Sequence, residues 1–355
     1  MNSQAIFATP DVTIVVSPRE RFSYTRESLE SIYEHTKYPF NLIYIDGGSP
    51  PHIKDYLIQQ AKQKQFQIIR TDYYLSPNRA RNIGLGQVTT KYVVFIDNDV
   101  VVTPDWLKPL VECAEETQAT VVSPLICQYL PLHTEIHCAG GQSRVAVETQ
   151  GETTKRRIIE KIYHQGRKVA DVLPQLQRQE TGLAEFHCMM VRTEIFEQIG
   201  FLDEKLLNTK EHIDFCILVT QAGGQVYLEP ASLMTYVPTS QLELTDIPYY
   251  MLRWSDAWEI ASLKHLREKW NITEDQYFKN KYNRLGWRRQ MTIIKPLSQK
   301  FLFGKINSRL ANKILGSVEK VINRLITYRY GQKHLSSVIQ SPNSKQDESA
   351  ITASK

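Results

Sequence analysis

The feature that most constrains the fold of this sequence is a regular alternation of short apolar runs with longer, helix-like segments. Apolar and β-branched residues gather at 11–16, 41–46, 66–70, 91–99 and 120–126. Several of the segments between these runs carry apolar residues at helical spacing. Short strands that alternate with helices predict an α/β domain with a mostly parallel, Rossmann-like sheet that is covered by helices on both faces.

Carboxylates stand where two of these predicted strands end. Asp46 and Asp97 each follow an apolar run directly, and ligands of such sheets bind beyond the carboxyl ends of the strands. Asp99 lies two residues after Asp97. Paired carboxylates of this kind suit Mg²⁺ or Mn²⁺, which prefer oxygen ligands and often share them with substrate phosphates. The alternative is a solvated turn in which Asp97 and Asp99 cap the following helix.

The segment Asp46-Gly47-Gly48-Ser49 offers a second binding feature. An aspartate at a strand end can accept hydrogen bonds from a base or a ribose, and glycine lets a ligand approach the backbone closely. A plain turn is the alternative interpretation. Asp46 and Gly47 are therefore expected beside Asp97 in one ligand site.

Changes in periodicity and composition divide the chain into a central domain and several flanking segments. The central domain carries an insertion with weak periodicity, which we expect to be irregular or peripheral and to form part of an acceptor-side wall. The expected parts are an N-terminal lead (1–10), the domain (11–238) with its insertion (128–180), a helical extension (239–290), a basic amphipathic helical region (291–333) and a disordered tail (334–355).

The sequence also indicates the compartment of the protein. The first ten residues lack the features of a secretory signal, and no uninterrupted apolar run approaches the roughly 18 residues that a membrane span needs. The five cysteines are scattered and show no paired spacing, which argues against a disulfide framework or a zinc site. We expect a cytoplasmic protein with reduced thiols.

Basic charge is concentrated near the C-terminus. Residues 279–333 contain fourteen Lys or Arg and one acid, Glu319. Apolar residues recur there every three or four positions, so an amphipathic basic helix is predicted that associates peripherally with the anionic cytoplasmic face of a membrane. Packing of this helix on the acidic body of the protein is the alternative. Nucleic acid is not an expected partner, because no recognised binding motif accompanies the charge. The apolar positions are Ile306, Leu310, Ile314, Val318, Val321, Ile322 and Leu325.

Six segments in order resemble the inverting family 2 glycosyltransferases of the GT-A fold, over about residues 11–238. VTIVVSPRERFSYTRESLESI resembles the opening strand and helix, IYIDGGS the nucleoside-binding segment, and NRARNIGLG the helix before the metal strand. YVVFIDNDVVVTPDWL resembles the strand with the D-x-D motif. FHCMMVRTEIFEQIGFLDE resembles the acceptor-side strand and its following turn, and KEHIDFCILVTQAGGQVYLEP resembles the helix that carries the catalytic base. Each segment alone is a weak match, and their order carries the resemblance.

The resemblance implies a role for each matched residue. Asp46, Gly47 and Asp97 would contact the nucleoside, and Arg81 would support the nucleotide pocket. Asp99, together with Asp97, would hold the divalent cation, Mn²⁺ or Mg²⁺, that bridges the donor diphosphate. The expected reaction moves a sugar from a nucleotide-diphosphate sugar, expected to be a UDP-sugar, to a hydroxyl of a glycan or lipid-linked acceptor, with inversion at the anomeric centre.

Two positions depart from the family pattern. The usual Glu-Asp pair is Glu211-His212 here, so Glu211, His212 and Asp214 all stay open as the catalytic base. The sequence favours Glu211, because a carboxylate suits a base beside a positively charged, oxocarbenium-like sugar. Tyr236 lies near the place where many relatives have a histidine that ligates the metal.

Other interpretations compete with this one. The altered pair at Glu211-His212 is also compatible with an inactive relative that binds nucleotide-sugar without transferring it. The absence of a G-x-G-x-x-G after the first strand argues against a Rossmann dehydrogenase. His133 and His137 have i,i+4 spacing without a helical pattern, which argues against a metal site formed by that pair. His187 could line the acceptor side of the pocket. The aromatic residues Tyr249, Tyr250, Trp254 and Trp258 fit helix packing better than stacking on a sugar.

Overall fold

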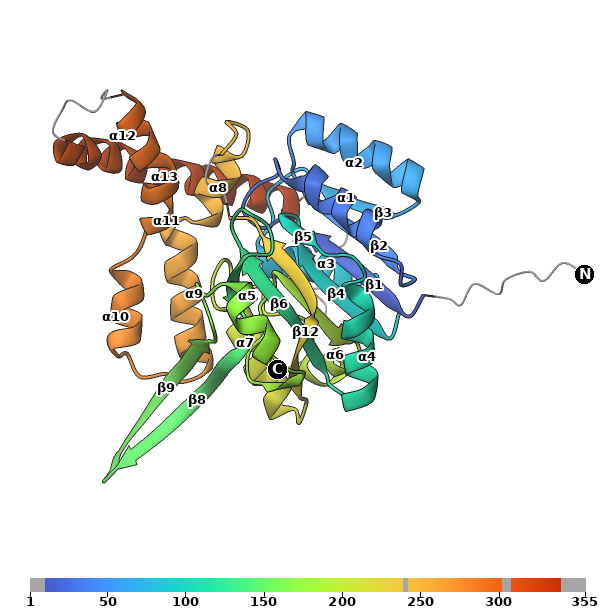
Figure 1. Cartoon of the computed structure of the whole chain (residues 1–355). Coiled ribbons are helices and arrows are strands. Elements are labelled where there is room, and N and C mark those ends of the chain that lie inside the picture. The colour runs from blue at the N-terminus through green and yellow to red at the C-terminus, as the bar shows by residue number, and fades with distance from the viewer. Residues whose placement is uncertain (1–9, 239–241, 302–307, 340–355) are drawn as a thin grey trace, which may run out of the picture.

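One large sheet forms the centre of the computed structural model, which describes residues 10–238, 242–301 and 308–339 (Figure 1). The strands follow one another in space in the order β10-β12-β6-β11-β4-β1-β2-β3, with β5 paired to β12 and β7 paired to β6. Their bounds are β1 (Val12–Ser17), β2 (Asn41–Gly47), β3 (Gln67–Thr71), β4 (Tyr92–Asp97), β5 (Val100–Val102), β6 (Val121–Gln128), β7 (Glu135–Cys138), β10 (Gln179–Thr181), β11 (Cys188–Arg192) and β12 (Val226–Tyr236).

The predicted mostly parallel sheet is confirmed. β3, β2, β1 and β4 are parallel neighbours, and β11 runs antiparallel between β4 and β6. Six of the eight strands along the main path therefore point the same way, because β12 is parallel to β6. Ser17 pairs with Asp97 where β1 and β4 end. This register brings the loop after β1 and the turn after β4 to the same edge of the sheet.

Helices cover both faces of the sheet, as the alternation of elements predicts. Along β4, Val94 and Ile96 pack into the core on one face, while Val93 and Phe95 pack into the core on the other. Side chains of α1, α2 and α4 fill the first core, and side chains of α3, α6 and α7 fill the second. The bounds are α1 (Thr25–His35), α2 (Pro51–Lys64), α3 (Pro77–Leu85), α4 (Leu107–Thr117), α6 (Ile195–Ile199) and α7 (Glu211–Gln221).

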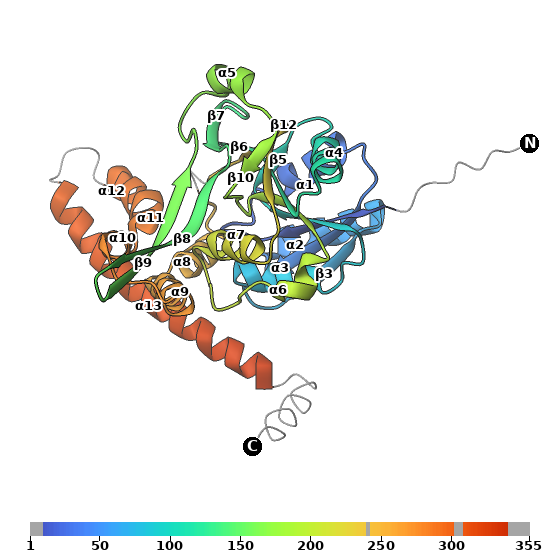
Figure 2. The ribbon, with the colours of Figure 1, turned by 90° about the horizontal axis from the view of Figure 1, so that it is seen from below.

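The segment 128–180 is more regular than its sequence suggests. β8 (Gly141–Gln150) and β9 (Thr153–Ile162) form a long antiparallel hairpin that projects from the sheet beside the C-terminal helices (Figures 1 and 2). A short helix, α5 (Val169–Val172), and a single 3-10 turn (Leu173–Gln175) follow it. Most side chains near the hairpin tip are polar and exposed, so the burial alternation that identifies a strand is missing there.

A third core attaches the C-terminal helices to the domain. Ile158 of β9 and Ile213 of α7 pack with Leu266 and Phe278 from the helices after the domain. The hairpin, α7 and these helices thus form one wall beside the sheet. The helices are α8 (Ile247–Arg253), α9 (Asp256–Lys269), α10 (Gln276–Tyr282), α11 (Trp287–Arg289), a π-helical turn (Gln290–Ile294), α12 (Lys295–Phe301) and α13 (Ser308–Ile339).

Helix α13 packs on the rest of the protein through polar side chains. Arg289 donates to the Glu319 carboxylate at 2.5 Å, and Asn323 donates to the Met251 carbonyl oxygen at 2.7 Å. The apolar side of the helix instead faces outward, with six side chains between 45% and 66% exposed. These outward side chains, called the outer stripe below, are Ile314, Val318, Val321, Ile322, Leu325 and Tyr328.

β12 contains an irregularity, and parts of the predicted division of the chain fall outside the described residues. The irregularity lies between Glu229 and Leu233. Pro230 lies within it and cannot donate to a ladder. The predicted lead and tail lie mostly in residues 1–9 and 340–355, and Ile306 of the predicted amphipathic helix also lies outside the described residues.

Candidate active site

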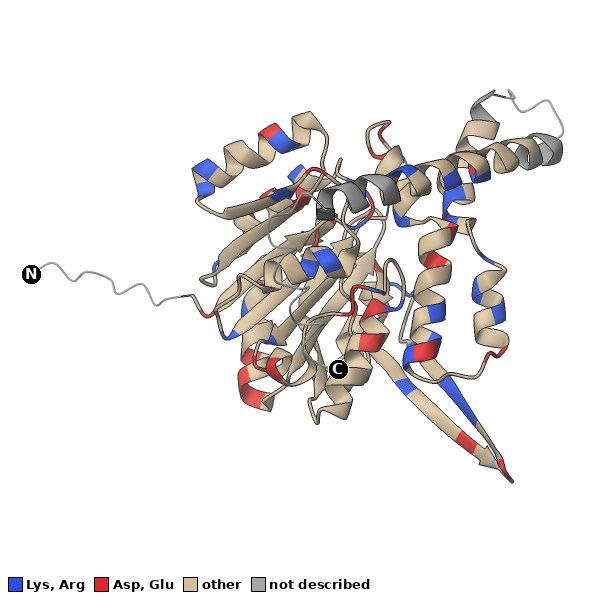
Figure 3. Cartoon of the chain, turned by 180° about the vertical axis from the view of Figure 1, so that it is seen from behind, with Lys and Arg blue, Asp and Glu red and all other residues tan. Residues whose placement is uncertain are grey.

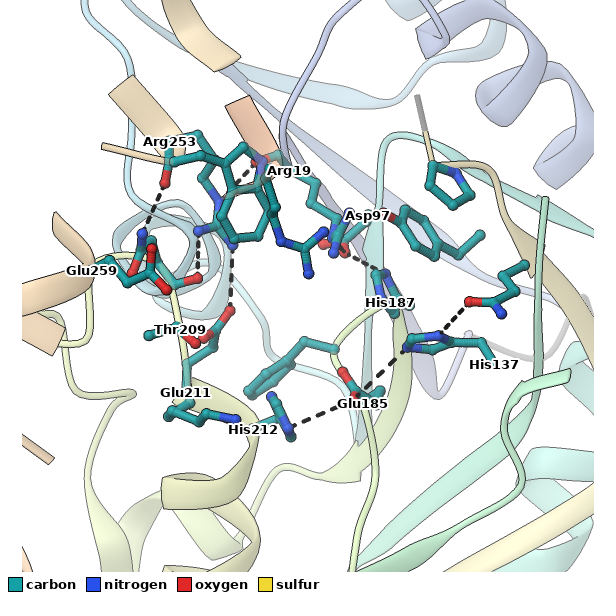
Figure 4. Close-up of a pocket in the computed structure, with 18 of the residues that line it drawn as sticks. Arg19, Asp97, His137, Glu185, His187, Thr209, Glu211, His212, Arg253 and Glu259 are labelled. Atoms are coloured by element: carbon teal, nitrogen blue, oxygen red, sulfur yellow. Dashed lines mark hydrogen bonds and ion pairs between the residues drawn. The ribbon is translucent and has the colours of Figure 1, made fainter. Parts of the chain in front are cut away.

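A cavity of about 480 Å³ opens beyond the carboxyl end of β4 (Figure 4). Its lining comes from the end of β4, the first turn of α7, β9, the end of β12 and the loops around α8 and α11. Residues as far apart in the chain as Arg19 and Arg288 therefore meet at it. Among the expected site residues, Arg81, Asp97, Glu211 and His212 line this cavity.

Asp97 is held from three sides. Its carboxylate accepts a hydrogen bond from Arg81 at 3.1 Å, forms an ion pair with the Arg19 Nε at 3.3 Å and lies 3.1 Å from the His187 Nδ1. Arg19 follows β1 and Arg81 lies on α3, so adjacent parts of the sheet edge meet at Asp97. These contacts fix the carboxylate in one orientation toward the cavity.

Asp99 has no such partners. Its side chain is fully buried, and neither carboxylate oxygen has a hydrogen-bond partner among the described residues. Burial raises the pKa of Asp99 to about 8; Arg19 opposes this shift, whereas the negative charges of Glu20 and Asp97 add to it. An unpaired buried carboxylate is costly, and a bound divalent cation would remove that cost. The Asp99 carboxylate therefore offers an oxygen donor that suits the predicted cation. Asp99 itself is not among the residues that line the 480 Å³ cavity.

Asn98, between the two aspartates, forms hydrogen bonds to the loop after β1. Its amide donates to the Arg21 carbonyl oxygen at 2.8 Å, and its side-chain oxygen accepts from the Arg19 amide at 3.1 Å. The residue thereby ties the turn after β4 to the loop after β1. This tie explains locally why Arg19 lies against Asp97.

Asp46 is also buried, but it is paired within its own part of the sheet edge. It accepts hydrogen bonds from the Ser49 amide and hydroxyl, both at 2.9 Å, and from Arg70 of β3. The next residue, Gly47, is closely surrounded, since a Cβ there would lie 3.2 Å from the Pro18 ring. Asp46 and Gly47 are not among the residues that line the 480 Å³ cavity.

Arg81 connects Asp97 to the first turn of α7. Its guanidinium is buried, lies 4.2 Å above the Phe186 ring and approaches the Glu211 carboxylate at 3.9 Å. Arg253 reaches the same carboxylate at 3.7 Å. Burial by itself would raise the pKa of Glu211, but Arg253 and Arg81 lower it below its ordinary value. Glu211 is thus a stably ionised partner of two arginines.

His212 faces the cavity from the next position of α7. Its Nε2 lies 3.6 Å from the Glu185 carboxylate and 4.0 Å from the Glu160 carboxylate, too far for a hydrogen bond. This nitrogen is buried and has no hydrogen-bond partner among the described residues. A ring nitrogen of His212 is therefore available to a ligand.

Asp214 lies elsewhere on α7. Its carboxylate accepts from Lys269 and from the Trp270 indole, both at 2.8 Å, and it does not line the cavity. These contacts join α7 to α9. The structure therefore separates Asp214 from Glu211 and His212.

His187 lines the cavity, as the sequence suggests, but its grouping with His137 and Glu185 escaped sequence reasoning. His137, Glu185 and His187 gather beside His212 although they come from β7 and from the loop before β11 (Figure 4). These four residues are called the imidazole wall below. The i,i+4 spacing of His133 and His137 gives no hint of it, because His133 turns to the Thr235 hydroxyl at 2.7 Å instead. No local spacing could have identified the wall, since its members approach one another only through the sheet.

Tyr236 and the aromatic residues of the C-terminal helices also have definite places. The Tyr236 ring stacks on His187 with ring centroids 3.9 Å apart, and Arg19 lies 4.1 Å from its centroid on the ring face. Trp254 lines the cavity. Tyr249, Tyr250 and Trp258 are buried, as expected for helix packing.

Comparison with known proteins supports the resemblance seen in the sequence. The sequence profile described as "Glycosyl transferase family 2" matches residues 13–200. The pre-mycofactocin glycosyltransferase of Mycobacterium tuberculosis is 24% identical over 234 residues, which is 65% of this chain and 44% of that protein. The succinoglycan biosynthesis protein ExoO of Rhizobium meliloti is 26% identical over 121 residues, 34% of each chain. This chain thus spans less than half the length of either relative.

Solved structures give a weaker likeness. GalNAc-T7, crystallised with UDP, GalNAc and Mn²⁺, superposes with a TM-score of 0.48 at 17% identity, over 78% of this chain and 55% of that chain. S. aureus TarS superposes with a TM-score of 0.45 at 12% identity, over 83% of this chain and 44% of that chain.

Proposed function

Because this chain belongs to glycosyl transferase family 2, we propose that it transfers a sugar from a nucleotide-diphosphate sugar to an acceptor hydroxyl. The proposed donor is a UDP-sugar, and the proposed acceptor is a glycan or a lipid-linked sugar. The reaction is a single displacement that inverts the anomeric centre.

The observation that carries this proposal is the unpaired carboxylate of Asp99. Its burial beside Asp97, at the carboxyl end of β4, suits a hard divalent cation such as Mn²⁺ or Mg²⁺. When bound, such a cation supplies positive charge to the diphosphate as the sugar departs. Asp97 is already oriented by Arg19 and Arg81. It can therefore accept hydrogen bonds from the nucleoside without reorganising.

We assign the role of base to His212. The sequence favours Glu211, but its contacts with Arg253 and Arg81 lower the pKa of its carboxyl and make it a weak base. An imidazole nitrogen with a free lone pair can accept a proton, and the His212 Nε2 has no partner among the described residues. His212 then takes the proton of the acceptor hydroxyl, whose oxygen attacks the anomeric carbon on the side opposite the diphosphate.

The central test is metal-dependent turnover. The purified full chain is incubated with a panel of UDP-sugars and released UDP is measured, first with EDTA and then with excess Mn²⁺. We expect turnover that EDTA abolishes and Mn²⁺ restores, and that is lost in Asp99→Asn. The matched control is Asp105→Asn, an exposed aspartate on the following loop that pairs with Lys37.

Turnover that persists in EDTA and in Asp99→Asn would contradict the metal assignment. Binding of UDP-sugar without turnover with any acceptor or water would favour the inactive, nucleotide-sugar-binding alternative.

We also propose that α13 associates with an anionic membrane surface. The outer stripe is exposed, and Lys320 and Arg324 lie beside it on the exposed surface of the helix. Lys and Arg recur along α10 to α13, whereas acidic residues are sparse there (Figure 3). An apolar stripe with basic neighbours suits the interface of an anionic bilayer. Among the residues that the structure describes, no helix has the length and apolar character needed to cross a bilayer.

Vesicle binding tests this association. The double variant Val321→Asp/Leu325→Asp should bind vesicles containing anionic lipid at least about tenfold more weakly, because losing ~1.4 kcal/mol of apolar burial already has that effect. The control Gln63→Asp/Gln87→Asp adds the same charge at exposed positions outside α13, in α2 and in the turn after α3. Equal vesicle binding by both double variants would rule out docking through the outer stripe.

A further inference from the structure

The imidazole wall has the composition of a transition-metal site. Metal-binding atoms of His137, Glu185 and His187 all lie within 4.8 Å of one another. The three side chains are largely buried, with His187 only 4% exposed. They reach the cavity from two separate segments, so the chain does not bring them together merely through local spacing.

Both imidazoles are held in the way that metal-binding histidines usually are. The His137 Nδ1 lies 3.0 Å from the Gln128 side-chain oxygen, and the His187 Nδ1 lies 3.1 Å from the Asp97 carboxylate. An oxygen acceptor beside Nδ1 favours the tautomer that carries the proton on Nδ1, which leaves the lone pair on Nε2. A ring fixed through Nδ1–H by an oxygen acceptor is the usual arrangement around a metal-binding histidine.

The separations within the wall are too long for hydrogen bonds. The His137 Nε2 lies 3.9 Å from the Glu185 carboxylate, and no hydrogen bond joins the two. Two donor atoms bound tetrahedrally to one zinc ion at ~2.0–2.1 Å lie about 3.4 Å apart. Small side-chain shifts would thus bring these atoms into coordination distance.

Ring packing does not account for this arrangement. His187 stacks on Tyr236 and meets His137 edge to face, with ring centroids 5.1 Å apart. Such contacts involve ring faces and edges, and they need neither a fixed tautomer nor a carboxylate. They leave the role of Glu185 beside the His137 Nε2 unexplained.

We propose that His137, Glu185 and His187 bind a zinc-class divalent cation, at a site separate from Asp99. Two imidazoles and one carboxylate suit zinc and its neighbours among the transition metals, whereas the carboxylate of Asp99 suits Mn²⁺ or Mg²⁺. Three protein ligands leave a coordination position open. The cation would therefore bind an oxygen of a ligand in the cavity.

The open position lies on the side of His212, whose Nε2 is 3.6 Å from Glu185. An acceptor hydroxyl or phosphate oxygen bound there would lie beside the proposed base. This last placement rests on the proposed function, whereas the metal site itself does not.

Cobalt binding tests the site without relying on activity. Co²⁺ is titrated into the metal-free full chain, and its visible absorption reports coordination by nitrogen; Zn²⁺ is then added as a competitor. We expect one equivalent of Co²⁺ with imidazole-type bands that Zn²⁺ displaces. Affinity should fall about tenfold or more in His137→Ala and in the isosteric Glu185→Gln.

Two variants serve as controls. His133→Ala removes a neighbouring histidine that bonds to Thr235, and it should leave the cobalt spectrum unchanged. Asp99→Asn should also keep the spectrum while it abolishes sugar transfer, so failure of the metal site and failure of the proposed function are distinguishable. The proposal is overturned by absence of nitrogen-type bands in the wild type, by unchanged affinity in His137→Ala and Glu185→Gln, or by loss of the bands in Asp99→Asn.

Discussion

The strand-end carboxylates Asp46 and Asp97 differ from the imidazole wall in how fully their polar groups are hydrogen-bonded. Asp46 and Asp97, at the ends of β2 and β4, are buried and fully engaged by arginines, a serine and a histidine. In the wall, Glu185 and the His212 Nε2 lie near partners that stay beyond hydrogen-bond distance. The strand-end carboxylates therefore have hydrogen-bond partners within the protein, whereas the His212 Nε2 has none among the described residues.

The difference separates positioning from binding. A carboxylate that is already paired helps to hold the fold and presents a fixed acceptor, whereas an unpaired buried group retains capacity for an incoming ligand. Asp99 differs from the other strand-end carboxylates. It lies in the same turn as Asp97, but its carboxylate has no hydrogen-bond partner among the described residues. In lacking hydrogen-bond partners, Asp99 resembles the His212 Nε2 of the wall.

The largest expected effect concerns the base. His212→Gln should lower kcat by about 10²–10⁴-fold, the usual contribution of a general base, with a much smaller change in KM. Asp214→Asn on the same helix should change kcat by less than about tenfold, because its contacts join α7 to α9. Steady-state kinetics with the best donor measures both variants. If Glu211→Gln loses far more kcat than His212→Gln, the carboxylate is the base.

The next effect concerns the stability of the engaged region. Arg81→Met should lower the free energy of unfolding by about 3–5 kcal/mol, because it leaves Asp97 and Glu211 buried with fewer opposite charges. Arg79→Met, on the same helix, removes a partly exposed contact with Glu204 at 3.7 Å and should cost less than about 1 kcal/mol. Denaturant unfolding measures both. Equal losses would mean that Arg81 acts through general packing only.

Asp99 should make stability depend on pH. Its pKa is raised to about 8 in the folded protein, above the ordinary value near 3.9 of the unfolded chain. Between these values the folded state holds one proton more than the unfolded state, so this contribution is complete below pH ~4 and declines as pH rises to 8. The decline is about 1.4 kcal/mol per pH unit.

Unfolding in EDTA at several pH values tests this dependence. Asp99→Asn should remove this part of the slope, and Mn²⁺ should stabilise the wild type most at pH 8, where the carboxylate is ionised. A slope that Asp99→Asn leaves intact would assign the titration to another group.

The smallest expected effect comes from the wall. Glu185→Gln should change the free energy of unfolding in EDTA by less than about 1 kcal/mol, because its contacts with His137 and His212 are longer than hydrogen bonds. The same substitution should weaken cobalt binding strongly. A large loss of stability without metal would show that the wall, like the strand-end carboxylates, is complete without a ligand.

Most of the sheet and its edge could be predicted from the sequence, because local patterns encode both. Apolar runs mark β1, β2 and β4, and the carboxylates stand directly after two of them. The resemblance to family 2, which depends on these same local segments, is confirmed by the matching profile. The positions of Asp97, Arg81 and Glu211 around one cavity agree with that resemblance, although their roles remain proposals.

The sequence could not predict what depends on distant contacts. The ion pairs that lower the pKa of Glu211 come from Arg81 and Arg253, which are more than 170 residues apart. The partners of His137 lie on another segment, and the outward orientation of the apolar side of α13 depends on Arg289 and Met251. Periodicity identifies an amphipathic helix, but it does not decide which face packs on the protein.

The side-chain amide of Asn98 links the turn after β4 to the loop after β1. Its side chain forms hydrogen bonds with the backbone of Arg19 and Arg21. The neighbouring residues Asp97 and Asp99 are the acidic residues of this turn. We therefore expect a ligand that draws the Asp99 carboxylate toward itself to shift the loop that carries Arg19 as well. Occupancy at the end of β4 would in this way change the position of the loop after β1.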